Sequence, residues 1–85
     1  VAAAQEADGS ALLKQAYELS QKAEDEASYN RVLELCQQAL AAGVPGDSVK
    51  YARDLMSWAH NRRGQVKLDA GDTKAALVEF ETALK

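Results

Sequence analysis

Apolar residues recur every three or four positions through most of the chain, which is the spacing of one face of an α-helix. The pattern falls into four stretches, separated by short segments rich in Gly, Asp, Ser and Ala. Ala, Leu, Lys, Glu and Gln dominate the composition and favour helix, and the absence of isoleucine disfavours strands. The sequence therefore predicts an all-α fold of four helices, joined by short turns so that neighbours run antiparallel.

The breaks between these stretches predict how the chain is organised. Residues 1–9 are expected to form a flexible tail. The strongest loop signal is GVPGDS, which begins at Gly43. It separates a first helical hairpin at residues 10–43 from a second at residues 48–85, with residues 44–47 as the loop. One domain of two antiparallel hairpins is the expected architecture.

Polar residues at the breaks are the expected helix caps. Ser10 is predicted to cap the first helix, and Gly43 to end the second. Either Asp47 or Ser48 is predicted to cap the third helix, which reaches about 22 residues by pattern. Asp72 is predicted to cap the fourth.

The apolar stripes supply the expected core. They comprise Leu12, Leu13, Ala16, Leu19, Ala23, Tyr29, Val32, Leu33, Cys36, Ala39, Leu40, Tyr51, Ala52, Leu55, Met56, Ala59, Val66, Ala75, Ala76, Phe80, Ala83 and Leu84. Cys36 is the single cysteine, so an internal disulfide and a cysteine-based metal cluster are excluded. We expect it to be a buried, inert small hydrophobe.

The charge balance bears on the class of partner. The net charge of −3 argues against a nucleic-acid-binding module, and no apolar run is long enough for a transmembrane span. Bases gather in the second half, at Lys50, Arg53, Arg62, Arg63 and Lys67. A solvated helix face is the expected explanation, with a patch for an acidic ligand as the alternative.

No catalytic or metal-binding motif accompanies this pattern. The chain has no Gly-rich phosphate loop, no HExxH and no CxxC, so no cofactor and no metal are predicted. The single histidine, His60, is expected to pack between helices rather than to act as a base, because no nucleophile with a matching acid accompanies it. We expect that the chain is not an enzyme.

The two predicted hairpins correspond to each other at an offset of 44 residues. Val32 then falls on Ala76, and Cys36 falls on Phe80. In the first helix of each hairpin, the same offset places Ser20 on Gly64, a glycine inside a helical stripe. Such internal similarity is typical of helical repeat proteins.

The second unit resembles the tetratricopeptide repeat family. The residues that carry the resemblance are Gly64, Gly71, Asp72, Ala76, Phe80, Ala83 and Leu84, together with His60-Asn61-Arg62-Arg63-Gly64-Gln65. The resemblance implies that small residues let paired helices approach closely while Phe80 fills the remaining space. It also implies a fragment of a right-handed α-α superhelix. The first unit departs from the pattern at Ser20 and Ala27-Ser28, Lys67 replaces an aromatic, and the offset exceeds the family's usual period of about 34 residues.

The resemblance also implies a concave groove, lined by the first helix of each hairpin, that binds a peptide or a partner segment. By position, the groove residues would be Lys14, Tyr17, Gln21, Trp58, Asn61, Gln65 and Leu68, with Arg62 available to bond a peptide. Trp58 is a candidate hot spot for binding a partner in this groove. The alternative is that the Trp58 side chain packs against the loop or the N-terminal segment. Some family members bind the C-terminal carboxylate of a chaperone with a Lys and an Asn of their first helix. The matching positions here are Tyr17 and Gln21, so binding of a chaperone's C-terminal tail is disfavoured.

The sequence thus favours a non-catalytic protein-interaction module, which we expect to be part of a longer protein. Self-association into a homo-oligomer and an accessory role beside a larger enzyme are the alternatives. The small polar opening VAAAQEADG is compatible with removal of a secretory signal, and equally with an arbitrary starting point. We expect a bacterial protein that is exported from the cytoplasm, with a cytoplasmic location as the alternative.

Overall fold

A computed structural model of the chain describes the backbone of residues 2–85 and the side chains of residues 9–85. The described residues form four helices and contain no strand. The helices are α1 (Ala2–Ser20), α2 (Glu26–Ala42), α3 (Gly46–Asp69) and α4 (Thr73–Ala83). The prediction of an all-α fold is confirmed.

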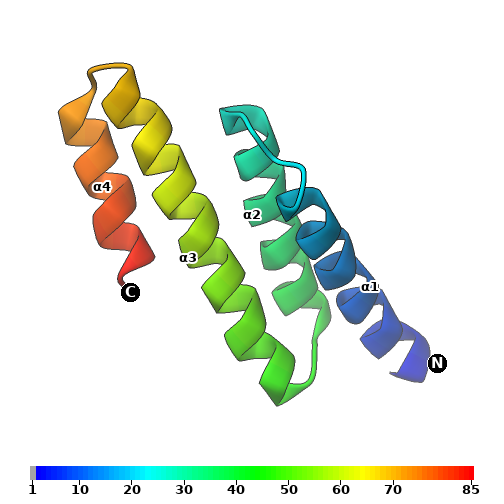
Figure 1. The fold of residues 1–85 in the computed structure, drawn as a ribbon. Coiled ribbons are helices and arrows are strands. Elements are labelled where there is room, and N and C mark those ends of the chain that lie inside the picture. Colours follow the sequence, from blue (N-terminus) through cyan, green and yellow to red (C-terminus); the bar gives the residue numbers. More distant parts are fainter. Residues whose placement is uncertain (1) are drawn as a thin grey trace.

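Consecutive helices run antiparallel and lie side by side in chain order (Figure 1). α1 packs on α2, α2 on α3 and α3 on α4, while α1 also touches α3. Among the described helices, α4 contacts α3 alone. The result is an elongated layer of 48 × 24 × 15 Å, in which α3 joins the α1–α2 pair to α4.

Polar caps and one glycine set three of the helix ends. Asp25 caps α2 by accepting a hydrogen bond from the Ser28 backbone N–H at 2.8 Å, and the hydrogen bonds from Ser28 lower the pKa of Asp25. Gly43 ends α2 with φ 97°, a conformation that favours glycine. Asp72 caps α4 by accepting from the backbone N–H of Ala75 at 3.2 Å. The predictions for Gly43 and Asp72 are confirmed.

The start of α1 differs from the prediction. Ser10 lies inside the helix and is not its cap, because α1 begins at Ala2. Residues 2–9, expected as a tail, are therefore helical, while Val1 lies outside the described residues. Gly9 is buried against the turn after α2, where a Cβ would collide with the carbonyl of Gly43. The missing side chain lets this part of α1 lie close to that turn.

The start of α3 also differs from the prediction. Pro45 is the N-cap, without a side-chain hydrogen bond, and α3 spans 24 residues. The Pro45 carbonyl accepts from the backbone N–H groups of Ser48 at 2.9 Å and Val49 at 3.2 Å. Asp47 and Ser48 thus lie within the first turn and are not caps. The Asp47 carboxylate there suits the positive end of the helix dipole.

The core lies mainly between α1, α2 and α3. Its buried residues are Leu13, Ala16, Val32, Leu33, Leu35, Cys36, Ala39, Ala52, Leu55 and Ala59. Cys36 is fully buried as predicted, and burial raises the pKa of its thiol to about 11. Two residues that we expected in the core are exposed: Tyr51 by 39% and Leu84 by 88%. Tyr51 faces α1 across a hollow, and Leu84 follows the last residue of α4, which packs only on α3 among the described helices.

The contact between α3 and α4 depends on one glycine. Gly64 is buried on α3, and a Cβ placed there would stand 2.5 to 3.0 Å from three carbon atoms of the Phe80 ring. Ala76 is buried beside this contact on α4. The expectation that Gly64 permits a close approach while Phe80 fills the space is confirmed.

A buried carboxylate also joins α3 to α4. Glu79 on α4 accepts a hydrogen bond from Arg63 Nη2 at 2.6 Å, and its other oxygen lies 2.9 Å from His60 Nδ1. His60 is half-buried between the helices, as predicted. Glu79 was not predicted, because its place on the buried face of α4 needs partners that lie 16 and 19 residues away along the chain.

Another ion pair, between α2 and α3, joins the first hairpin to the second. Lys67 on α3 donates to Glu26 at the start of α2, at 2.9 Å. This hydrogen bond, together with the charge of Lys67, lowers the pKa of Glu26. The basic residues of the second half are therefore not simply a solvated face, since Arg63 and Lys67 each bind a carboxylate on another helix.

Candidate functional site

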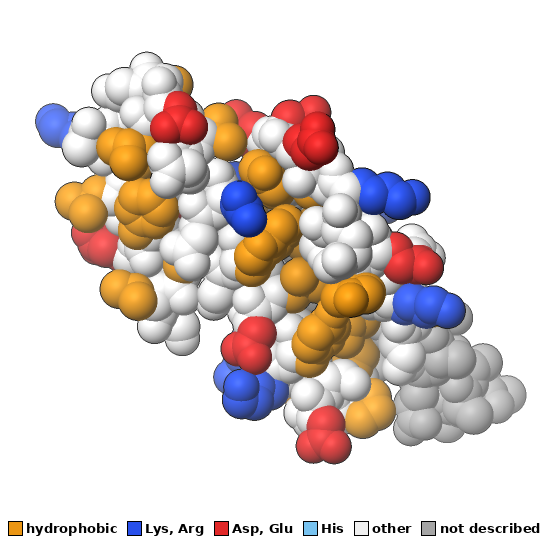
Figure 2. All heavy atoms as spheres, in the orientation of Figure 1, with side chains coloured by type: hydrophobic (Ala, Val, Ile, Leu, Met, Phe, Trp, Pro, Cys, Tyr) orange, Lys and Arg blue, Asp and Glu red, His pale blue; other side chains and the backbone are white. Residues whose placement is uncertain are grey.

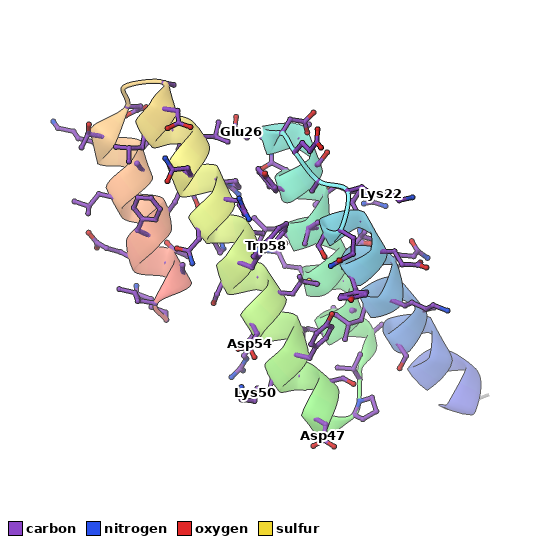
Figure 3. The ribbon with its side chains drawn as sticks, in the orientation of Figure 1. Lys22, Glu26, Asp47, Lys50, Asp54 and Trp58 are labelled. Carbon is purple, nitrogen blue, oxygen red and sulfur yellow. The ribbon has the colours of Figure 1, made fainter. Side chains whose placement is uncertain are left out.

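A hollow of about 450 Å³ lies where the C-terminal end of α1 faces the first half of α3. Its lining residues are Tyr17, Ser20, Gln21, Tyr51, Asp54, Leu55 and Trp58. Hydrophobic side chains gather at the surface over this seam (Figure 2), and Asp54 and Trp58 follow each other along α3 beside it (Figure 3). We call this feature the α1–α3 hollow.

Trp58 both packs on the core and lines the hollow. Its ring meets Tyr29 of α2 edge-to-face, with ring centroids 5.6 Å apart. The guanidinium of Arg62 lies 5.5 Å from the Trp58 ring centroid, a cation–π distance. The side chain is half-buried and packs against the core cluster. Contacts on two sides therefore fix the indole while part of its surface stays accessible.

Two tyrosines face each other across the hollow. Tyr17 on α1 and Tyr51 on α3 have ring centroids 6.1 Å apart and a tilt of 50°. Both side chains are exposed. Burial raises the pKa of the Tyr51 phenol, and the neighbouring Tyr17 adds to the shift. The Tyr51 hydroxyl can donate a hydrogen bond to a ligand.

Polar groups line the remainder of the hollow. Ser20 Oγ donates to the Tyr17 carbonyl at 2.6 Å, and Gln21 Nε2 donates to Ser20 Oγ at 3.4 Å. Asp54 pairs with Lys50 at 3.1 Å in an exposed ion pair. Gln21 and Asp54 retain hydrogen-bonding capacity toward a ligand, since an amide and a carboxylate each accept more than one bond. Binding sites are usually lined by aromatic and other apolar side chains together with a few polar groups, as this hollow is.

The structure brings together part of the predicted groove. Tyr17, Gln21 and Trp58 line the hollow, and Arg62 lies against Trp58. The other predicted residues are exposed and do not line it: Lys14, Asn61, Gln65 and Leu68. Lys14 precedes Tyr17 by nearly one turn. The last three lie on the part of α3 that continues beyond the end of α1.

Sequence reasoning missed Tyr51, Ser20, Asp54 and Leu55. A signal for Tyr51 was present, because it precedes Trp58 by seven residues and therefore lies on the same helix face, two turns earlier. The apolar stripe instead suggested that Tyr51 belonged to the core.

Other features of the described residues are weaker candidates for a binding site. A second hollow, of about 530 Å³, lies between α3 and the end of α4, and its lining includes Lys50, Arg53, His60 and Leu84 but no Phe, Tyr or Trp. No group of three metal-ligating side chains occurs among the described residues. Within the same part of the chain, no helix combines the length and apolarity needed to cross a membrane. The α1–α3 hollow is therefore the strongest candidate.

A scan against models of known protein families gave no match, and searches of curated proteins and of solved structures gave none either.

Proposed function

We propose that this chain is a non-catalytic protein-interaction module that binds a segment of another protein in the α1–α3 hollow. The observation that carries the proposal is the convergence of Tyr17, Tyr51 and Trp58 on one accessible hollow between two helices. Large aromatic rings held in place by their surroundings are the side chains that contribute most at protein interfaces.

Two features support a repeat of the tetratricopeptide type as the scaffold. The hairpins correspond at a constant offset, which relates Ser20, buried on α1, to Gly64, buried on α3. The approach of Phe80 to Gly64 is the packing that the family resemblance implies. A right-handed superhelical course is part of this proposal.

The environments of the two most reactive side chains support a non-catalytic role. Cys36 is fully buried, and its raised pKa keeps the thiol neutral and therefore a poor nucleophile. His60 is half-buried, with Nδ1 next to Glu79, which in turn binds Arg63. These contacts serve the joint between α3 and α4.

The hollow suits a partner segment with an apolar anchor side chain. Trp58 and the two tyrosines offer apolar surface for the anchor, while Gln21 and Asp54 can bond the backbone N–H groups of an extended peptide. The wide opening between α1 and α3 suits a surface-lying segment more than an enclosed small molecule.

The proposal is tested by selecting displayed peptides on the 85-residue chain. Trp58 is the only tryptophan, so its fluorescence reports directly on occupancy of the hollow. We expect selected peptides to change Trp58 emission and to bind at least about tenfold more weakly to Tyr17→Ala and Tyr51→Ala, because aromatic truncation in an interface commonly costs more than 1 kcal/mol. Gln37→Ala, at an exposed position of α2, is the matched control. Peptides that bind both tyrosine variants as tightly as the wild type would contradict the proposal.

A further inference from the structure

The outer face of α4 carries an apolar pair between opposite charges. Lys74, Leu77, Val78 and Glu81 follow the spacing of one helical face, and all four are exposed. Leu77 is 56% exposed and Val78 is 63% exposed. Hydrophobic side chains are visible at the surface over α4 (Figure 2). This set of four residues is called the α4 outer stripe.

The buried residues of α4 lie on its opposite side. Ala76 and Glu79 are buried and Phe80 is half-buried, with Glu79 and Phe80 contacting α3. Since α4 packs on α3 alone among the described helices, the outer stripe covers no other helix of the chain. Leu77 and Val78 adjoin each other on this face, and contiguous exposed apolar surface is the feature that marks interaction sites.

The order of residues in the stripe is complementary to itself. Lys74 lies three residues before Leu77, and Glu81 lies three residues after Val78. If two copies of α4 run antiparallel about a two-fold axis between residues 77 and 78, each Lys74 faces Glu81 of the other copy. The same axis sets each Leu77 against a Val78. Self-complementarity of this kind is the requirement for a two-fold symmetric interface.

We propose that a second copy of this chain docks on the α4 outer stripe and forms an antiparallel two-fold dimer. The opposite flank of the molecule is a poorer partner for the stripe, because the exposed residues of α1 include Lys14, Gln15 and Glu18. Two apolar stripes buried against each other remove more apolar surface from water than one stripe set against that polar helix. The dimer leaves the α1–α3 hollow open, so this inference is independent of the proposed peptide binding.

The interface is small, since α4 has 11 residues and is therefore about 16 Å long. Stable complexes bury on the order of 1,600 Å² in total, which a pair of such short helices does not reach. We therefore expect a reversible monomer–dimer equilibrium, sensitive to protein concentration and to the charges at residues 74 and 81.

Charge-reversal variants distinguish the proposed antiparallel dimer from non-specific association of the chain. Sedimentation equilibrium of the wild type is compared with Lys74→Glu, with Glu81→Lys, and with their equimolar mixture. Each variant alone replaces two attractive pairs with two repulsive ones, so we expect its dimerisation to weaken by about tenfold. The mixture restores opposite charges at both pairs and should form heterodimers. The double variant Lys74→Glu/Glu81→Lys should dimerise like the wild type.

The helix itself tolerates both reversals, which keeps the test interpretable. Lys74 lies in the first turn of α4 and Glu81 in the last, so each reversal places the new charge where the helix dipole favours it. Lys22→Glu, an identical substitution at an exposed position beyond α1, is the matched control and should leave dimerisation unchanged. A wild type that stays monomeric at millimolar concentration, or a mixture that associates no better than its components, would overturn the proposal.

Discussion

Gly64 on α3 lies against the ring of Phe80 on α4, so that a Cβ on Gly64 would stand 2.5 Å from Cε1 and 2.8 Å from Cδ1 of that ring. A glycine inside a helix costs about 1 kcal/mol relative to alanine. The close approach of the two helices offsets that cost, because a methyl group at this point would force the ring away from α3.

Gly64→Ala should therefore destabilise the protein although alanine is the better helix former. We expect a net loss of roughly 1 kcal/mol in the free energy of unfolding, measured by urea denaturation. The decisive comparison is made in the Phe80→Ala background. There the obstruction is gone, and the same substitution should stabilise by up to about 1 kcal/mol. An unchanged sign in both backgrounds would mean that the ring does not restrict residue 64.

Glu79 should contribute more to stability than an exposed glutamate. Glu79→Ala leaves the half-buried Arg63 and His60 without their carboxylate, and the buried Nε of Arg63 already has no partner. We expect a loss of about 2–3 kcal/mol, below the range for fully buried pairs because the Arg63 side chain is 26% exposed. The matched variant is Glu34→Ala, whose exposed pair with Arg31 should be worth less than about 1 kcal/mol. Equal losses for the two variants would contradict this ranking.

The ion pair between Glu26 and Lys67 should make the contact between the hairpins sensitive to acid. The pKa of Glu26 is lowered from 4.5, so its contribution is present above that pH and is lost as the pH falls through the folded-state value. The melting temperature of the wild type should exceed that of Glu26→Gln near neutral pH. The two should converge once the pH has fallen below the lowered folded-state pKa of Glu26.

High salt should reduce the same difference, because the Glu26 side chain is 43% exposed and its ion pair is screened. Glu24→Gln, two residues earlier at an exposed position, is the control and should show a smaller difference at neutral pH. A gap for Glu26→Gln that stays constant down to low pH would contradict the assigned role of the carboxylate.

Cys36 should resist alkylation in the folded protein. Its pKa is raised from 9.0 to about 11, so near pH 8 the thiolate fraction is roughly one-hundredth of the unfolded value. Complete burial slows the reaction further. Iodoacetamide labelling followed by mass spectrometry should show slow modification in buffer and rapid modification in urea. Fast labelling without denaturant would place the thiol at the surface.

Periodicity in the sequence was sufficient to predict the helices but not all of their ends. Asp72 and Gly43 were found because a cap and a left-handed turn depend on local chemistry. Ser10 was mistaken for a cap because residues 1–9 were expected to form a tail, whereas Gly9 lies within α1, against the turn at Gly43, 34 residues later. A single sequence does not reveal such a contact.

The candidate site could be predicted in part for the same reason. Trp58 and Tyr17 were found from helix faces and family resemblance, whereas Tyr51 was assigned to the core. A stripe identifies which residues share a face, but the neighbouring helix decides whether that face is buried. Leu84 illustrates the same limit, since its stripe continues from Phe80 although it is 88% exposed. Glu79 was missed because its partners lie on another helix.

The attachment of α4 to α3 alone has a consequence for how the fold opens. α4 can separate from α3 without disturbing the contacts among α1, α2 and α3, so its amide hydrogens should exchange with solvent before those of the core helices. That partial opening would uncover Gly64 and free His60, while the α1–α3 hollow remained assembled. The contact between α4 and α3 would then be lost at a lower free-energy cost than the packing that forms the α1–α3 hollow.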